Sequence, residues 1–102
     1  MKIIKCLSEY IEEELADADK YITKAMKVKA EHPELAELLY QLSLEEMTHM
    51  TRLHGEVEKI IAAYRRTNGE PPAAMQAVYD FLHERMIEKA KAVKIEQGMF
   101  RE

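Results

Sequence analysis

The sequence predicts an all-α fold: an antiparallel two-helix hairpin followed by a third, shorter helix, with the hairpin dimerising into a four-helix bundle. Apolar residues recur at alternating intervals of three and four along most of the chain, as they do on one face of a helix. Only three glycines and three prolines occur among the 102 residues, and no segment shows the alternation of a strand. We expect one domain over residues 1–102, because this length supports a single core.

The first helix is predicted over residues 3–30. One charged residue, Glu14, interrupts its apolar stripe, whereas Glu12 and Glu13 fall off the stripe and are explained as solvated surface. A rotated stripe that turns Leu15 inward and leaves Glu14 at its edge is an open alternative. The stripe consists of Ile4, Leu7, Ile11, Glu14, Ala18, Tyr21, Ala25 and Val28.

The second helix is predicted over residues 33–66. Pro33 suits the first turn of a helix, where its missing N–H costs nothing. The short link before it makes the first two helices antiparallel. Gly69 supplies the stop, because glycine readily adopts the left-handed conformation that ends helices.

The third helix is predicted over residues 71–97 and begins at the pair Pro71-Pro72. Its Asp80 and His83 lie off the apolar stripe, and we interpret this pair as surface. The stripe consists of Met75, Val78, Leu82, Met86, Ala90 and Val93. Because the hairpin needs cover for its shared stripe, a second copy of the same hairpin is expected to supply it.

The second helix contains the residues that indicate a metal-binding site. Glu46 and His49 replace apolar residues in its stripe and, three positions apart, project from the same side. An unpaired carboxylate there costs several kcal/mol unless a cation or proton neutralises it. A metal ion is the interpretation we favour, and a buried Glu-His hydrogen bond across a dimer interface is the alternative. The stripe consists of Leu35, Leu39, Leu42, Glu46, His49, Leu53 and Ile60.

Counting along the hairpin brings a third ligand to the same level. Glu14 lies 18 residues before His32 in the link and Glu46 lies 14 residues after it, a difference of about one helical turn. A dimer then collects two copies each of Glu14, Glu46 and His49. This is the ligand set of di-iron carboxylate bundles. Carboxylates with imidazoles suit iron, with manganese or zinc as alternatives.

The neighbouring residues are weaker candidates for a role at the metal site. Tyr21, two turns from Glu14, is a candidate hydrogen-bond donor to a ligand carboxylate or an ordinary core tyrosine. Met47 and Met50 are expected to pack rather than bind metal. Cys6, the only cysteine, permits no internal disulfide. Asp17, one turn from Glu14, is interpreted as a solvated acid, with an outer metal-entry group as the alternative. His54 and Glu56 lie one to two turns past the site, and Glu56 is expected at the surface or the dimer edge.

The motifs Glu13-Glu14-Leu15-Ala16-Asp17-Ala18-Asp19-Lys20-Tyr21 and Glu45-Glu46-Met47-Thr48-His49 resemble those of the encapsulated ferritins, and more generally of ferritins and rubrerythrins. The similarity covers residues 9–66. It implies a half-ferritin hairpin whose ferroxidase centre, with two irons per dimer held by Glu14, Glu46 and His49, forms in the homodimer or a ring of dimers. It also implies an encapsulin shell as partner, although residues 96–102 do not resemble a targeting tail.

The function expected from these features is Fe(II) oxidation in iron storage or detoxification. The alternatives are an erythrin-type peroxide reductase and a helical dimerisation module without enzymatic activity. A formal charge of -4, without a Lys/Arg block, argues against nucleic acid or an anionic membrane as partner. The first six residues lack the long apolar region of a signal peptide, so a cytoplasmic protein is expected. The resemblance to encapsulated ferritins adds an encapsulin compartment as an alternative location.

Overall fold

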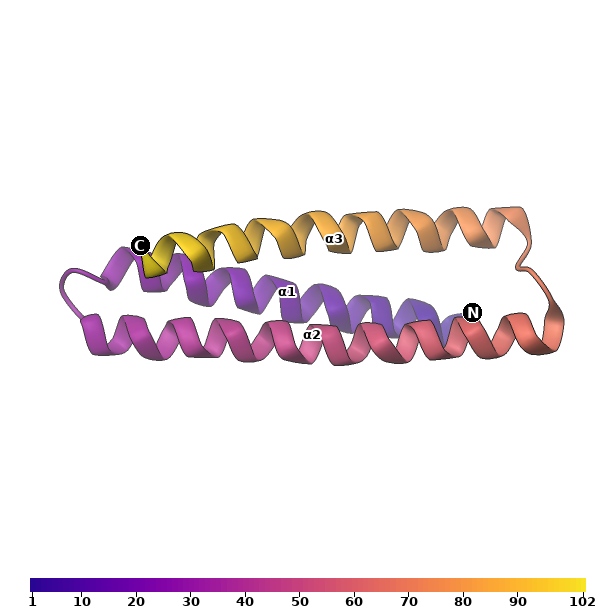
Figure 1. Ribbon diagram of the computed structural model, residues 1–102, viewed down its shortest axis with the longest axis horizontal. Coiled ribbons are helices and arrows are strands. Elements are labelled where there is room, and N and C mark those ends of the chain that lie inside the picture. The colour runs from indigo at the N-terminus through magenta and orange to yellow at the C-terminus, as the bar shows by residue number, and fades with distance from the viewer.

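The computed structural model describes all 102 residues as three helices joined by two short links, without a strand (Figure 1). Helix α1 spans Lys2–Val28, α2 spans Pro33–Asn68 and α3 spans Ala73–Arg101. The all-α prediction is confirmed, and the predicted ends of α1 and α2 lie within two residues of the observed ones.

Local sequence signals explain where α2 begins and ends. Pro33 occupies its first turn. Gly69 follows its last residue with a φ of 77° and donates its backbone N–H to the carbonyl of Arg65 at 3.0 Å. A residue with a Cβ would be strained at this positive φ, so glycine fits the position.

The prediction that α3 is shorter than both hairpin helices is wrong. It has 29 residues, against 27 in α1 and 36 in α2. The four residues beyond the predicted end at residue 97 stay helical because Phe100 is buried against the hairpin and stacks on Tyr40, with ring centroids 4.9 Å apart. Arg101 adds a paired contact with both carboxylate oxygens of Glu37.

The third helix runs back along the hairpin and makes an elongated three-helix bundle of 56 × 19 × 17 Å (Figure 1). It is antiparallel to α2, and its C-terminus lies near the link between α1 and α2. It makes polar contacts with both helices of the hairpin. On α1, Glu12 pairs with Arg85 at 3.0 Å and also with Lys89, and Thr23 donates to Glu96 at 3.1 Å.

The core lies between the three helices, in two clusters along the bundle. The central cluster contains Ile11, Leu15, Ala18, Met47, Met50 and Val93. The second cluster, toward the α1–α2 link, contains Ile22, Ala25, Ala36 and Phe100. Met47 and Met50 thus pack in the core, as predicted. Burying each of the larger apolar side chains in these clusters stabilises the fold by about 1.5–3 kcal/mol.

The observed stripe of α1 is the rotated one. Leu15 is 2% exposed and Ile22 is fully buried, whereas Glu14 and Tyr21 lie at the edge of the stripe and are only half-buried. In α2 the buried stripe likewise runs through Ala36, Ser43, Met47 and Met50 rather than through the leucines one position earlier. The reason is α3, which draws the core toward the side of the hairpin that it covers.

One polar chain crosses the core where all three helices meet. The Gln97 amide of α3 donates to the Ser43 hydroxyl of α2 at 2.9 Å, and this hydroxyl donates to the Ala18 carbonyl of α1 at 2.8 Å. Buried polar atoms that are fully paired in this way stabilise one register over others, because a slip would leave them unpaired.

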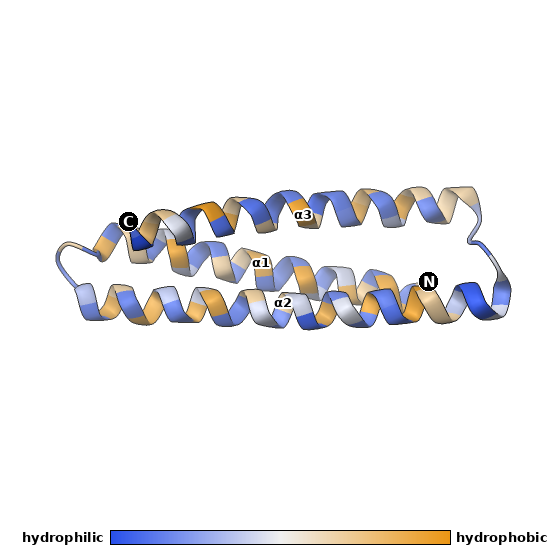
Figure 2. Cartoon of the chain, in the orientation of Figure 1, coloured by the Kyte–Doolittle hydropathy of each residue, from blue (hydrophilic) through white to orange (hydrophobic).

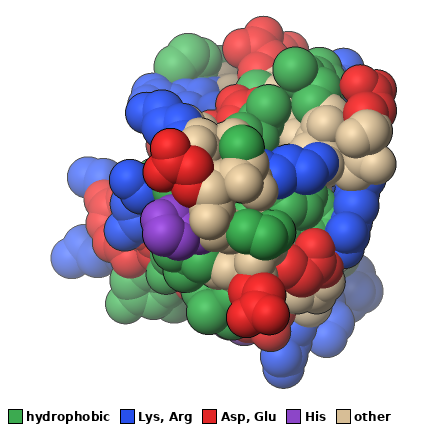
Figure 3. Space-filling view, turned by 90° about the vertical axis from the view of Figure 1, so that its left-hand side faces the viewer, with side chains coloured by type: hydrophobic (Ala, Val, Ile, Leu, Met, Phe, Trp, Pro, Cys, Tyr) green, Lys and Arg blue, Asp and Glu red, His purple; other side chains and the backbone are tan.

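Polar and apolar residues alternate along each helix (Figure 2), and none of the three is apolar over a stretch long enough to cross a bilayer. The end of the bundle at the α1–α2 link presents acidic, basic and apolar side chains interspersed, without a large patch of one charge (Figure 3).

Candidate metal centre

The structure brings the three predicted ligands together. Glu14 comes from α1, and Glu46 and His49 come from adjacent turns of α2. Each offers one ligand atom, and these atoms all lie within 4.8 Å of one another. Ligands of a single ion at about 2.1 Å lie no more than about 4.2 Å apart. Small side-chain rotations are therefore enough to close this cluster around an ion.

Neither carboxylate is fully paired by the chain itself. His49 Nδ1 lies 3.4 Å from Glu14 Oε2 and 3.6 Å from Glu46 Oε2, which is ion-pair range but long for a hydrogen bond. Glu14 Oε2 is buried and has no hydrogen-bond partner. A buried, unpartnered carboxylate oxygen is costly. A bound cation would supply the missing interaction.

The two carboxylates also disturb each other. A hydrogen bond with Glu14 is the main cause that raises the pKa of Glu46, burial adds to it, and the nearby His49 partly offsets both. Such a contact between two carboxyl groups needs a shared proton, because both cannot be ionised at short range without repulsion. A divalent cation can replace that proton.

The cluster opens toward solvent on one side. The side chain of His49 is 51% exposed, whereas those of Glu14 and Glu46 are 25% and 18% exposed. Three protein ligands on one wall leave coordination positions free for a substrate or for ligands from another chain. This openness is typical of a reactive metal site rather than of a closed structural one.

The ion pairs of α1 show which way the cluster faces. Glu12 pairs with α3, while Glu14, two residues later, faces α2. Residues two apart on a helix point to nearly opposite sides. The cluster therefore lies on the face of the hairpin that α3 leaves uncovered.

This uncovered face is partly apolar. Leu38 is 55% exposed and lies eleven residues, about three turns, before His49 on the same side of α2. Tyr10, one turn before Glu14, is 49% exposed, and Leu35 is 44% exposed. The ligands thus sit within a surface that mixes apolar and chelating side chains.

The other residues named from the sequence take no part in the cluster. Tyr21 is half-buried and makes no hydrogen bond to the three ligands within the chain. Asp17 pairs with Lys20 at 3.8 Å, although its charge also helps to raise the pKa of Glu46. Glu56 pairs with Lys59 on the surface. Cys6 is a half-buried free thiol.

His54 was not expected to be part of any site, and the structure places it against His83 of α3. The only signal for it in the sequence is its position seven residues after the buried Met47, which puts it on the core side of α2.

The raised pKa of Glu46 gives a testable pH dependence. A carboxyl group whose pKa is higher in the folded state stabilises that state below its ordinary pKa, and this stabilisation is lost as the pH rises through the raised value. The contribution of Glu46 to the stability of the metal-free protein should therefore be smaller at neutral pH than near the ordinary carboxyl range. Glu46→Gln should raise the Tm at neutral pH by a few degrees and flatten this dependence, as measured by circular dichroism.

The matched control for this experiment is Glu45→Gln, which removes an exposed carboxylate from the adjacent position. It should keep the pH dependence of the unmodified chain. If the Tm of Glu46→Gln changed with pH in the same way as the Tm of the unmodified protein, Glu14 and Glu46 would not be coupled.

Comparisons with protein-family models, curated proteins and solved structures found no match. The function must therefore be argued from the chemistry of the site.

Proposed function

We propose that this protein is a ferroxidase that oxidises Fe(II) to Fe(III) at a di-iron site formed across a homodimer interface. The observation that supports it best is the cluster of Glu14, Glu46 and His49, with its unpartnered carboxylate oxygen, on the uncovered face of the hairpin. Oxygen-rich ligands with an imidazole suit iron, whereas a soft thiolate site is lacking.

One chain supplies half of such a centre. Two carboxylates and one imidazole can hold one iron and leave positions open, and a second copy related by a two-fold axis brings the same set. The apolar side chains around the cluster support this assembly, because Leu38, Leu35 and Tyr10 are exposed in the single chain. The four helices of two hairpins then form the bundle, with each α3 on its outside.

The pairing of two irons explains what the site would do. Two Fe(II) ions together give up the two electrons that reduce O₂ to hydrogen peroxide with the uptake of two protons, and each becomes Fe(III). Glu14 and Glu46 hold the ions and stabilise the higher charge of Fe(III) better than that of Fe(II). His49, at the solvent side, fixes their position as a neutral ligand.

The experiment that tests this function is Fe(II) oxidation in air by the metal-stripped protein, followed by the absorbance of Fe(III). We expect rapid oxidation that saturates at about two irons per dimer. His49→Ala should abolish the rapid phase. Because the His49 side chain is 51% exposed, its removal should not unfold the protein, so the lost oxidation would report on the metal site.

Oxidation at the background rate would contradict a ferroxidase. In that case hydrogen peroxide in place of air distinguishes the erythrin-type alternative, because a peroxide reductase oxidises the reduced site much faster with peroxide. A protein that binds no iron and whose Tm is unchanged by chelators would instead be the dimerisation module.

A further inference from the structure

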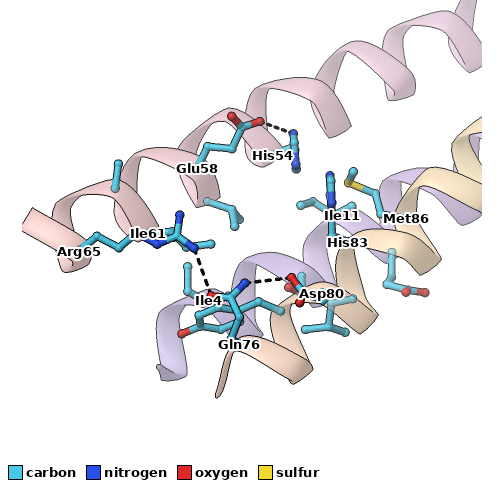
Figure 4. A pocket seen from close by; sticks show the side chains of 16 residues that line it. Ile4, Ile11, His54, Glu58, Ile61, Arg65, Gln76, Asp80, His83 and Met86 are labelled. Carbon is cyan, nitrogen blue, oxygen red and sulfur yellow. Dashed lines mark hydrogen bonds and ion pairs between the residues drawn. The ribbon is translucent and has the colours of Figure 1, made fainter. Parts of the chain in front are cut away.

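A second cluster of metal-ligating side chains lies outside the centre described above, in a groove between α2 and α3. The groove has a volume of about 520 Å³, and α1 closes its floor with Ile4 and Ile11 (Figure 4). Its walls carry two histidines, His54 from α2 and His83 from α3. These side chains have no role in the proposed oxidation.

The two imidazoles face each other across the groove. Their ring centroids are 5.3 Å apart and their planes are nearly parallel, at 3°. With metal–nitrogen bonds of about 2.0 Å, two imidazoles on a tetrahedral ion have centroids about 5 Å apart. The separation of the centroids is close to that value. Because the lone pairs of parallel rings do not converge, one ring must turn about its Cβ–Cγ bond for both nitrogens to bind the same ion.

A contact with Glu58 orients His54 as a ligand. Its Nδ1 lies 3.0 Å from Glu58 Oε1, and this contact favours the neutral tautomer that carries its proton on Nδ1. The lone pair is then on Nε2, at the end of the ring that points into the groove (Figure 4). A carboxylate that fixes the tautomer of a histidine in this way is the usual companion of metal-bound histidine.

Two further features favour a cation. Met86, three residues after His83 and so on the same side of α3, lines the groove with its thioether. The groove is also lined by the carboxylates of Glu58 and Asp80, against the single guanidinium of Arg65, while a third carboxylate, Glu12, is already paired with Arg85 and Lys89.

The geometry points to a binding site for a late first-row transition-metal ion, Zn(II) or Cu(I), held by His54 and His83 between α2 and α3. Imidazole ligands suit both ions, and a thioether favours Cu(I). Such an ion ties together two helices that the groove otherwise separates, so its binding stabilises the bundle by mass action. The site is independent of the proposed oxidation.

The test uses His49→Ala protein, in which the first centre is disabled, and titrates Zn(II) or Cu(I) against a competing chelating dye. We expect one ion per chain and a rise in Tm on binding. His54→Ala and His83→Ala should each weaken binding at least 100-fold and remove the rise, and Glu58→Gln should weaken it about 10- to 100-fold. His32→Ala, at the exposed link, is the matched control and should bind as before.

Met86→Leu distinguishes the two ions because it nearly conserves volume and removes the sulfur. A loss of Cu(I) affinity with unchanged Zn(II) affinity assigns the thioether as a ligand and copper as the preferred ion. If Met86→Leu binds Zn(II) and Cu(I) as tightly as before, the thioether is not a ligand and the site is a zinc site with two histidine ligands. The site is refuted if the His49→Ala protein binds neither ion, or if binding survives the loss of His54 or His83.

Discussion

Glu14→Ala is expected to lower the rate of Fe(II) oxidation about 100-fold or more while leaving a folded protein. The carboxylate is one of only three ligands in each chain, so its loss leaves an incomplete set. The fold should tolerate the change, because Glu14 Oε2 makes no hydrogen bond and the substitution relieves the contact with Glu46. Stopped-flow absorbance measures the rate, and circular dichroism measures the fold.

Glu13→Ala is the matched control, since Glu13 is exposed at the adjacent position of α1. It should oxidise Fe(II) at the unmodified rate. If Glu14→Ala retains the rapid phase, the assignment of Glu14 as a ligand is wrong, whatever the activity of the other variants.

Leu38→Glu is expected to weaken dimerisation at least 100-fold and to remove the rapid oxidation with it. A carboxylate placed in the proposed interface would have to be desolvated without a partner, which costs several kcal/mol. The single chain should fold normally, because Leu38 is 55% exposed there. Sedimentation velocity gives the oligomeric state, and the oxidation rate is measured on the same sample.

The control for this surface is Phe81→Glu, which introduces the same charge at an apolar residue of α3 that is 61% exposed. It should leave the dimer intact, because α3 lies on the outside of the proposed bundle. The opposite result, with Phe81→Glu monomeric and Leu38→Glu dimeric, would place the interface on α3 and contradict a centre shared between hairpins.

Local signals explain why the hairpin could be predicted from the sequence. Pro33 and Gly69 set the limits of α2 through their own backbone restrictions, which need no tertiary information. The position of Glu46 relative to His49 follows from helix geometry, and a short link fixes the level of Glu14 within about a turn. These are the features that the structure confirms.

The contacts of α3 could not be predicted in this way. Its last turn depends on the packing of Phe100 against Tyr40, which is about 60 residues away in sequence. The inward position of Leu15 depends on which side of α1 the third helix covers. The approach of His83 to His54 depends on the same register. Side chains at the edge of a stripe can be assigned to a face only when all packing partners are known.

The most direct test of the central claim is a crystal structure of the protein loaded with Fe(II), with anomalous scattering measured at the iron absorption edge. Two iron peaks between two chains, each contacted by Glu14, Glu46 and His49, are the expected result. Iron held within one chain without a facing copy, or no iron at these residues, would contradict a di-iron centre shared across a dimer.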